Sequence, residues 1–232
     1  MTDTDGQKRD AAHAAVERFV RSGATVGLGS GTTSAFVVRR IGELLDAGEL
    51  GGVRGIPTSE GTAALAREVG IPTVSLAEAR PTLTLDGADE IGPGLAAVKG
   101  LGGALLREKI VAAASTTGLV LVADASKTVD SLGTRAPVPV EVDPFGYQAT
   151  LEALSVLGCQ PRLRIDAAGP ERPFVTDGGH YTADCAFDGI GDPAALEADI
   201  RAIPGALECG LFVGLALAAV FADGEGVRIL EK

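Results

Sequence analysis

The sequence predicts an α/β protein in which a mostly parallel, Rossmann-like sheet domain carries a smaller inserted α+β domain of the ferredoxin-like type. Two observations lead to this class. Short apolar runs alternate with stretches of helical periodicity as far as residue 133, and from residue 134 the pattern strand, helix, strand occurs twice in succession. We therefore expect an α/β domain at residues 1–133 and 205–232 and a small α+β domain at residues 134–204.

The first part of the chain predicts a helix at 8–21, a buried strand at 24–28 and a second helix over 36–45. Between this strand and the second helix lies the loop Gly29-Ser30-Gly31-Thr32-Thr33-Ser34. A strand, a glycine-rich loop and a helix together form a layout in which backbone N–H groups and the helix dipole bind an anion. The loop has neither the third glycine of a dinucleotide site nor the lysine of a nucleotide-binding loop, which leaves a monophosphate or sugar hydroxyls as its ligand, or a purely structural turn.

The next elements continue the alternation. Helices are expected at 59–69, which Thr58 or Ser59 could cap, and at 102–115. Extended segments are expected at 53–56, 72–76, 82–85 and 119–123. Three polar motifs, which begin at Gly29, Asp86 and Asp124, thus directly follow expected strands. In open α/β sheets, ligands bind at this edge.

The small domain is expected to contain strands at 138–142, 160–165 and 181–187, and helices at 145–157 and 193–203. A turn at 177–179 separates its two halves. The apolar runs between residues 206 and 230 are strand-like again, and we expect them to complete the sheet of the first domain.

Composition limits the classes of function. At 232 residues and 46% hydrophobic content the chain can form a globular core, and none of its apolar stretches reaches the roughly 18 residues of a membrane span. The polar N-terminus does not resemble a secretory signal, so we expect a cytoplasmic protein. The net charge of −11 argues against nucleic acid and anionic membranes as partners. A chain this acidic and this poor in lysine is typical of proteins from halophilic organisms. We therefore hypothesise that the protein comes from such an organism.

The three cysteines are widely spaced and form no CxxC motif, which argues against a disulfide framework and against a zinc site. We expect them to be buried as small apolar side chains. His13 and His180 lie outside the motif loops and are expected to be structural.

The stretch from Asp86 to Lys109 places three carboxylates and a lysine among several glycines, directly after an apolar-rich run. Glu108 falls in the helix expected at 102–115, where poor solvation would raise its pKa and make it a useful general base; on its own, however, a solvent-facing glutamate is the simpler interpretation. Lys99 is a natural electrophile for an oxyanion. Asp86, Asp89 and Glu90 could alternatively bind magnesium, although the neighbouring lysine would compete for these carboxylates.

Taken together, the motifs resemble those of the A-type ribose-5-phosphate isomerases, in order and over nearly the whole chain. They are Gly29-Ser30-Gly31-Thr32-Thr33, Asp86-Gly-Ala-Asp-Glu90, Lys99-Gly-Leu-Gly-Gly103, Arg107-Glu-Lys109, Ala123-Asp-Ala-Ser-Lys127, Pro139-Val-Glu-Val142 and Thr176-Asp-Gly-Gly179. The resemblance implies interconversion of D-ribose 5-phosphate and D-ribulose 5-phosphate through a cis-enediol in the pentose phosphate pathway, without a metal or another cofactor. It also implies a homodimer or a homotetramer.

The resemblance assigns a role to each matching position. Glu108 would be the proton acceptor, Lys99 would stabilise the enediolate, and Asp86 and Asp89 would act near the sugar oxygens. The other substrate-binding residues would be Ser30, Gly31, Thr32, Thr33, Gly87, Ala88, Gly100, Leu101, Gly102 and Lys127.

Some positions depart from the pattern of that family. Leu101 and Gly179 replace a glycine and an asparagine that are usual there, and we expect altered packing from both rather than lost chemistry. An N-terminal lysine that some members direct at the substrate could be Lys8, but the register slips toward Arg9, and neither is assigned.

The use of lysine supports two of these positions independently of the resemblance. Only five of the twenty basic residues are lysines, yet Lys99 and Lys127 both fall in proposed site loops, where a compact ammonium differs in effect from a guanidinium.

Two other functions remain open. A sugar-phosphate deaminase would share the anion-binding loop, although nothing in the sequence points to ammonia release. A non-catalytic sugar-phosphate sensor would not need the aspartates, the lysine and the glutamate together, and a DNA-binding segment of the usual kind is not recognisable.

Overall fold

The computed structural model describes residues 4–167, 169 and 172–232, and the chain forms two compact units. Unit 1 comprises residues 1–88, 107–127 and 215–232, and unit 2 comprises residues 89–106 and 128–214. Among the described residues, no helix combines the length and the apolar character needed to cross a membrane.

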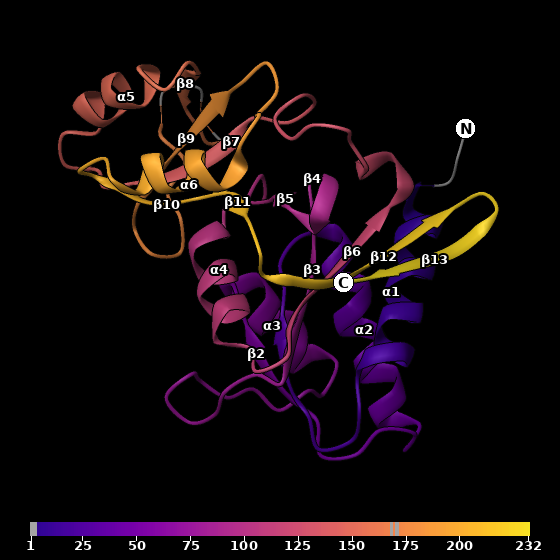
Figure 1. The fold of residues 1–232 in the computed structure, drawn as a ribbon. Coiled ribbons are helices and arrows are strands. Elements are labelled where there is room, and N and C mark those ends of the chain that lie inside the picture. Colours follow the sequence, from indigo (N-terminus) through magenta and orange to yellow (C-terminus); the bar gives the residue numbers. More distant parts are fainter. Residues whose placement is uncertain (1–3, 168, 170–171) are drawn as a thin grey trace. The chain divides into compact units, whose positions relative to one another are not determined.

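Unit 1 is built on a six-stranded sheet in the order β13-β12-β6-β3-β1-β2. All neighbouring strands are parallel except β13, which forms an antiparallel hairpin with β12 (Figure 1). The strands are β1 (Thr25–Leu28), β2 (Arg54–Pro57), β3 (Leu83–Gly87), β6 (Gly118–Asp124), β12 (Ala216–Asp223) and β13 (Gly226–Glu231). Its helices are α1 (Thr4–Phe19), α2 (Thr32–Asp46), α3 (Glu60–Glu68), most of α4 (Leu105–Ala114) and the short η2 (Ala125–Lys127).

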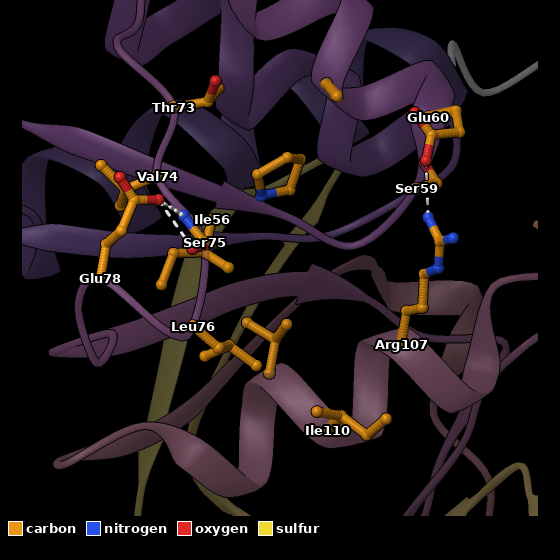
Figure 2. A pocket seen from close by; sticks show the side chains of 13 residues that line it. Ile56, Ser59, Glu60, Thr73, Val74, Ser75, Leu76, Glu78, Arg107 and Ile110 are labelled. Atoms are coloured by element: carbon orange, nitrogen blue, oxygen red, sulfur yellow. Dashed lines mark hydrogen bonds and ion pairs between the residues drawn. The ribbon is translucent and has the colours of Figure 1, made fainter. Parts of the chain in front are cut away.

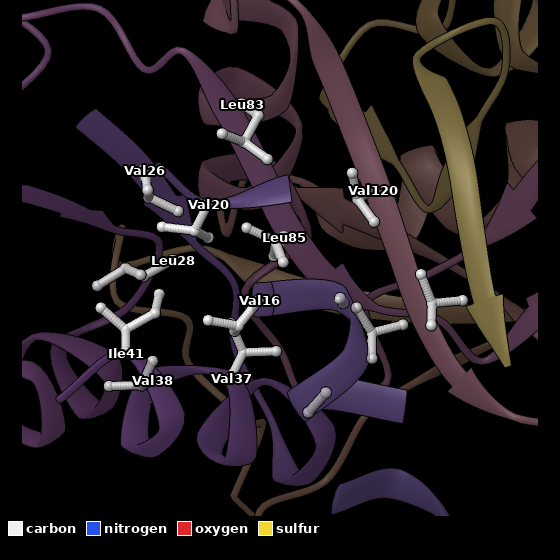
Figure 3. Packing of buried hydrophobic residues seen from close by; sticks show 14 of the residues in the cluster. Val16, Val20, Val26, Leu28, Val37, Val38, Ile41, Leu83, Leu85 and Val120 are labelled. Carbon is white, nitrogen blue, oxygen red and sulfur yellow. The ribbon is translucent and has the colours of Figure 1, made fainter. Parts of the chain in front are cut away.

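The core of unit 1 lies between its sheet and the helices α1 and α2. Figure 3 shows Val16 of α1, Val20 just after this helix, and residues of α2 such as Ile41 packed against strand residues such as Leu85, and all of these side chains are buried. The central strands are buried on both faces, which explains why they appear in the sequence as continuous apolar runs. This packing holds the carboxyl ends of β1, β3 and β6 in fixed positions.

Unit 2 contains a four-stranded antiparallel sheet in the order β10-β7-β9-β8. Its elements along the chain are β7 (Val138–Val142), α5 (Tyr147–Ser155), β8 (Gln160–Leu163), β9 (Tyr181–Ala186), α6 (Pro193–Arg201) and β10 (Ala206–Cys209). Two strand–helix–strand halves with this strand order form the expected ferredoxin-like arrangement. Leu154 of α5 and Ile200 of α6 are fully buried in its core.

A second, three-stranded sheet completes unit 2 in the order β11-β5-β4. It consists of β4 (Glu90–Ile91), β5 (Ala97–Val98) and β11 (Leu211–Phe212), and the 3-10 helix η1 (Pro93–Leu95) connects β4 to β5. Strands of two residues are too short to show alternation, and for this reason the sequence did not predict β4 and β5.

Several expected elements differ from the structure. Of the C-terminal apolar runs, only β12 and β13 complete the sheet of unit 1, because β10 pairs with β7 and β11 pairs with β5. Thr73 contributes an isolated bridge to Gly55 rather than a strand at 72–76. The helix expected from residue 102 begins at Leu105, because Gly103 has a φ of +82° and glycine is a poor helix former.

The compact units also differ from the expected domain bounds. Residues 89–106 group with unit 2, where β5 pairs with β11, and so do residues 205–214, which include the fourth strand of the ferredoxin-like sheet. The division of the chain into independent domains stays a prediction.

Candidate functional site

Three motif loops follow neighbouring parallel strands of unit 1. The strands β1, β3 and β6 are adjacent in the sheet, and Leu28 is in register with Leu85, whose partner on β6 is Val120. The loop after β1, the Asp86-Gly87 end of β3 and the η2 turn after β6 therefore share one edge of the sheet. This is the edge at which the sequence predicted a ligand.

The loop after β1 leads directly into helix α2. Gly31 is the N-cap residue, with a φ of +91°, and the first hydrogen bond of the helix joins the N–H of Ala35 to the carbonyl of Gly31. The N–H groups of Thr32, Thr33 and Ser34 consequently have no preceding helix carbonyl to pair with. Together with the helix dipole, they form a site suited to an anion.

Lys8 adds a positive charge to this anion site. Its Nζ atom lies 3.4 Å from Thr32 Oγ1 and 3.4 Å from Asp5 Oδ1. Arg9, the alternative left open by the sequence, instead forms an ion pair at 3.0 Å with its neighbour Asp10, and both side chains are about half exposed. The structure thus distinguishes the two residues, which are adjacent in the sequence but lie on different sides of α1.

The Ser30 hydroxyl belongs to a cluster of four hydroxyl groups, together with those of Thr58, Ser59 and Thr62. Its Oγ atom lies 2.8 Å from Thr58 Oγ1, 2.8 Å from Ser59 Oγ and 3.2 Å from Thr62 Oγ1. Thr58 and Thr62 donate to the carbonyls of Leu28 and Gly29, while Ser59 caps α3 by accepting from the Thr62 N–H. The cluster fixes the start of the loop against α3, and only the cap at Ser59 was foreseen from the sequence.

Asp86 lies at the carboxyl end of β3 and is 1% exposed. Its Oδ1 atom accepts hydrogen bonds from the Ser30 N–H at 3.1 Å, the Ser34 hydroxyl at 2.9 Å and its neighbour Gly87 N–H at 2.8 Å. A Cβ atom at Gly29 would lie 2.0 Å from this oxygen, which explains the glycine there. Asp86 therefore belongs to the same cluster as the anion-binding loop.

Glu108 lies in the first part of α4 and is 3% exposed, which excludes the solvent-facing interpretation. One turn further along the helix, Val111 packs on the middle of the sheet: its carbonyl accepts from Thr84 Oγ1, and its side chain fills the space beside Gly27. Because crossover helices run antiparallel to the strands, residue 108 is closer than residue 111 to the carboxyl edge that carries Asp86.

Lys127 ends η2 and is half-buried at the same edge of unit 1. The turn is stabilised by Asp124, a buried residue whose Oδ1 atom accepts hydrogen bonds from the Ser126 N–H and the Ser126 hydroxyl. The motif at residues 123–127 thus combines a structural aspartate, Asp124, with a lysine, Lys127, at the carboxyl edge of the unit 1 sheet.

Of the remaining predicted residues, Ala88 directly follows β3 in unit 1, and the others lie in unit 2, on the segment from Asp89 to Gly102. Asp89 Oδ2 accepts a hydrogen bond of 3.0 Å from the Leu101 N–H, so the carboxylate lies beside the Lys99–Gly102 loop. Lys99 follows β5, is 3% exposed and places its Nζ atom 5.2 Å from the centre of the Phe212 ring. Its backbone N–H donates to the Gly210 carbonyl at 2.8 Å.

Glu90 has a structural role that the sequence did not reveal. It is fully buried, and its carboxylate accepts hydrogen bonds from the N–H groups of Gly133 at 2.6 Å, Arg135 at 2.5 Å and Ala136 at 2.8 Å. These bonds weaken the alternative that Asp86, Asp89 and Glu90 bind magnesium, because the Glu90 carboxylate already accepts hydrogen bonds from a backbone turn.

His180 is structural, as expected. Its Nδ1 atom lies 2.8 Å from Glu141 Oε1, and the same oxygen accepts from the Thr176 hydroxyl at 2.9 Å. Glu141 is 2% exposed, so this pair satisfies a buried carboxylate. The cysteines are all free and buried, also as expected.

A hollow of about 480 Å³ lies within unit 1 and is lined by none of the predicted site residues. Figure 2 shows the ion pair between Arg107 of α4 and Glu60 of α3, at 2.9 Å, on one side of it. On the other side, the hydroxyl and the N–H of Ser75 donate to the exposed Glu78, which lowers the pKa of that carboxyl. Ser59 lines this hollow as well as belonging to the hydroxyl cluster.

The predicted site residues thus form two groups. Unit 1 brings together the Ser30–Thr33 loop, Asp86 and Gly87, Glu108 and Lys127, and unit 2 brings together Asp89 and the Lys99–Gly102 loop. The first group offers an anion site and buried carboxylates, and the second a buried ammonium beside a glycine-rich loop. Such groups can bind a phosphate ester, move a proton and stabilise an oxyanion.

Comparisons with known proteins cover nearly the whole length of the chain. The sequence model of the family described as ribose 5-phosphate isomerase A (phosphoriboisomerase A) matches residues 54–226. The ribose-5-phosphate isomerase A of Gloeobacter violaceus is 53% identical over 230 residues, covering 98% of this chain and 97% of the relative. The one of Roseiflexus castenholzii is 50% identical over 226 residues, covering 97% and 94%.

Solved structures with the same fold agree with the sequence comparisons. A D-ribose-5-phosphate isomerase in complex with phospho-erythronic acid is 35% identical, has a TM-score of 0.96 and matches over 99% of this chain and 100% of that chain. A ribose 5-phosphate isomerase A from Methanocaldococcus jannaschii is 36% identical, with a TM-score of 0.91 over 97% and 98%. These likenesses extend over both compact units.

Proposed function

This chain belongs to the ribose 5-phosphate isomerase A family, and on that premise we propose how its residues interconvert D-ribose 5-phosphate and D-ribulose 5-phosphate. The chain is an aldose–ketose isomerase. The observation that carries the proposal is that one edge of the sheet in unit 1 combines an anion site at the start of α2 with the buried carboxylates Asp86 and Glu108. Neither a deaminase nor a non-catalytic sensor has a comparable observation in its favour.

The phosphate group binds at the anion site of unit 1. The N–H groups and hydroxyls of Thr32 and Thr33 donate to its oxygens, and Lys8 and Lys127 supply positive charge. This local charge matters because the protein as a whole carries a net charge of −11 and does not attract a phosphate from a distance. Ser30 contributes by fixing the loop through its hydroxyl and its N–H.

Asp86 and Asp89 open the furanose ring. In this step the hydroxyl on carbon 1 loses a proton, the ring oxygen gains one, and the bond between carbon 1 and the ring oxygen breaks. One carboxylate accepts the first proton and the other carboxyl group donates the second. The product is the open-chain aldehyde on which isomerisation takes place.

Glu108 then transfers a proton between carbon atoms. Its carboxylate removes the proton from carbon 2, the electron pair forms the double bond between carbons 1 and 2, and the aldehyde oxygen becomes an oxyanion next to the Lys99 ammonium. The hydroxyl proton on oxygen 2 passes to oxygen 1, and the protonated Glu108 returns its proton to carbon 1. Atoms and charges balance, and the steps need no oxidant.

The decisive experiment measures ribulose 5-phosphate formed from ribose 5-phosphate, with and without EDTA. We expect activity that survives EDTA. For Glu108→Gln we expect a fall in kcat of about 10²- to 10⁴-fold, because the amide cannot accept the proton. Glu60→Gln is a suitable control, since Glu60 is largely exposed.

The outcomes separate the parts of the proposal. Near wild-type turnover by Glu108→Gln would overturn the assignment of the base, and loss of activity in EDTA would restore the magnesium alternative. A wild-type protein that forms no ribulose 5-phosphate would contradict the function itself.

The family also supports a statement about assembly and location. We propose a homodimer or homotetramer that acts in the cytoplasm on a small sugar phosphate, without a nucleic acid or a membrane as partner. Light scattering coupled to size-exclusion chromatography tests the assembly: a mass of 23.4 kDa, that of one chain, would contradict it.

A further inference from the structure

Arg164 directly contacts the Lys99–Gly102 loop of unit 2. It follows β8, and its side chain is 13% exposed. Its Nη1 atom donates to the carbonyl oxygens of Gly100, at 3.1 Å, and of Leu101, at 3.0 Å. Neither the motifs of the sequence nor the proposed function includes this residue.

The guanidinium of Arg164 is itself held in place. Its Nε atom donates to Asp184 Oδ2 at 2.9 Å, and its Nη2 atom donates to Asp184 Oδ1, which makes a two-point ion pair with β9. Its central carbon lies 5.7 Å from the centre of the Phe174 ring. A Cβ atom at Gly103 would lie 2.3 Å from Phe174 Cζ, so the ring also packs against the end of the loop. The fork of an arginine suits three such contacts, whereas a lysine does not.

Binding of two successive carbonyls determines where the N–H groups of the loop point. In a trans peptide the C=O and the N–H point in opposite directions. Arg164 therefore directs the N–H groups of Leu101 and Gly102 away from itself. The Leu101 N–H meets Asp89 Oδ2, as described above, whereas the Gly102 N–H makes no hydrogen bond among the described residues.

We propose that Arg164 is a positioning residue of the isomerase, which orients the peptide groups of the Lys99–Gly102 loop so that the Gly102 N–H donates to an oxygen of the reacting sugar. This inference rests on the proposed function, because it assumes that the loop binds substrate. A donor fixed in advance costs no reorganisation when negative charge develops on that oxygen, so its effect is largest in the transition state.

The test compares Arg164→Gln and Arg164→Lys with Arg162→Gln. Arg162 is a matched control, because it is an exposed arginine of β8, two residues before Arg164 and opposite Asp184 in the register, and among the described residues it makes no hydrogen bond with the loop. For Arg164→Gln we expect kcat/KM to fall about 10- to 100-fold, mainly through kcat, which is less than the roughly 10²- to 10³-fold effect of removing an oxyanion donor outright. Arg164→Lys should recover part of this loss, and Arg162→Gln should match the wild type.

Two further measurements distinguish positioning from a merely structural role. Guanidinium ion at millimolar concentration should partly restore kcat in Arg164→Ala and leave the wild type unchanged. The inhibition constant of phospho-erythronic acid, whose carboxylate resembles the enediolate, should rise in Arg164→Gln by more than the KM for ribose 5-phosphate rises. Circular dichroism melting of each variant reports the folded fraction to which kcat is normalised.

An Arg164→Gln enzyme with wild-type kcat and inhibition constant would overturn the inference. So would an activity loss that disappears on normalisation to folded protein, or one that guanidinium does not relieve at all. Failure of the proposed function looks different, since the wild type and the Arg162→Gln control would then lack isomerase activity as well.

Discussion

The fold distinguishes Lys8 from its neighbour Arg9, which the sequence alone does not. It is one of five lysines, and in the sequence it stands beside Arg9 with nothing to distinguish the two. The helix α1 turns Lys8 toward Thr32 at the start of α2, while Arg9 turns to Asp10. The difference comes from the 3.6-residue period of the helix, because adjacent residues point about 100° apart.

Replacing Lys8 by Met should therefore weaken phosphate binding without much effect on the chemical step. We expect KM to rise about 10-fold or more, as for the loss of a hydrogen bond to a charged group, with kcat within about twofold of the wild type. Steady-state kinetics on ribose 5-phosphate measure both constants. Arg9→Met is the control, and an equal rise in KM for both variants would contradict the assignment of Lys8.

The residues that the sequence predicted for the site and those that it left out differ in a physical respect. Asp86, Lys99 and Glu108 lie in motifs that the resemblance covers, and their burial agrees with a role inside the protein. Glu90 and Arg164 act on backbone groups more than 40 positions away, and only the fold reveals such partners. Local propensity cannot report a contact of this kind, whatever the residue type.

At the scale of elements, Glu90 connects β4 to the turn at residues 133–136. Glu90→Gln should lower the free energy of unfolding by about 2–4 kcal/mol, because an amide has one acceptor oxygen where the carboxylate has two, and a buried N–H without a partner costs about 1–3 kcal/mol. Denaturant unfolding followed by circular dichroism measures the change. Glu152→Gln, on the exposed side of α5, should change stability by less than about 0.5 kcal/mol.

Two results would contradict this prediction. One is a Glu90→Gln protein as stable as the wild type, which would mean that the turn finds other hydrogen-bond acceptors. The other is an equal loss in Glu152→Gln, which would reflect a general effect of lost charge and not the bonds of this turn.

The elements themselves were predictable where several residues share a pattern. The strands of unit 1 are continuous apolar runs, the strand at 138–142 was located to the residue, and the ferredoxin-like order follows from two successive strand–helix–strand halves. The assignment of β10 was wrong because a strand of four residues does not reveal which sheet it joins. Pairing partners are set by tertiary contacts, which periodicity does not contain.

At the scale of the whole molecule, the charge of −11 remains the feature with the clearest consequence for solution behaviour. Charges of one sign repel one another, and the Debye length shortens from about 10 Å at 0.1 M salt to about 3 Å at 1 M. We therefore expect the melting temperature to rise by several degrees between 0.1 M and 2 M KCl, with activity retained. Differential scanning calorimetry tests this.

An equal osmolality of sucrose controls for effects of solute exclusion, which act on any protein surface. A melting temperature that is indifferent to KCl, or one that rises as much in sucrose, would contradict the hypothesis of a salt-adapted surface.

The strand order in unit 1 also affects how the protein is made. The strand β12, residues 216–223, lies between β6 and β13, so an interior position of the sheet is filled by a segment that leaves the ribosome long after β6, residues 118–124. Until then β6, which is buried along most of its length in the finished fold, has an open apolar edge. A nascent or truncated chain that lacks residues 216–223 is for this reason expected to aggregate more readily than a chain that contains them.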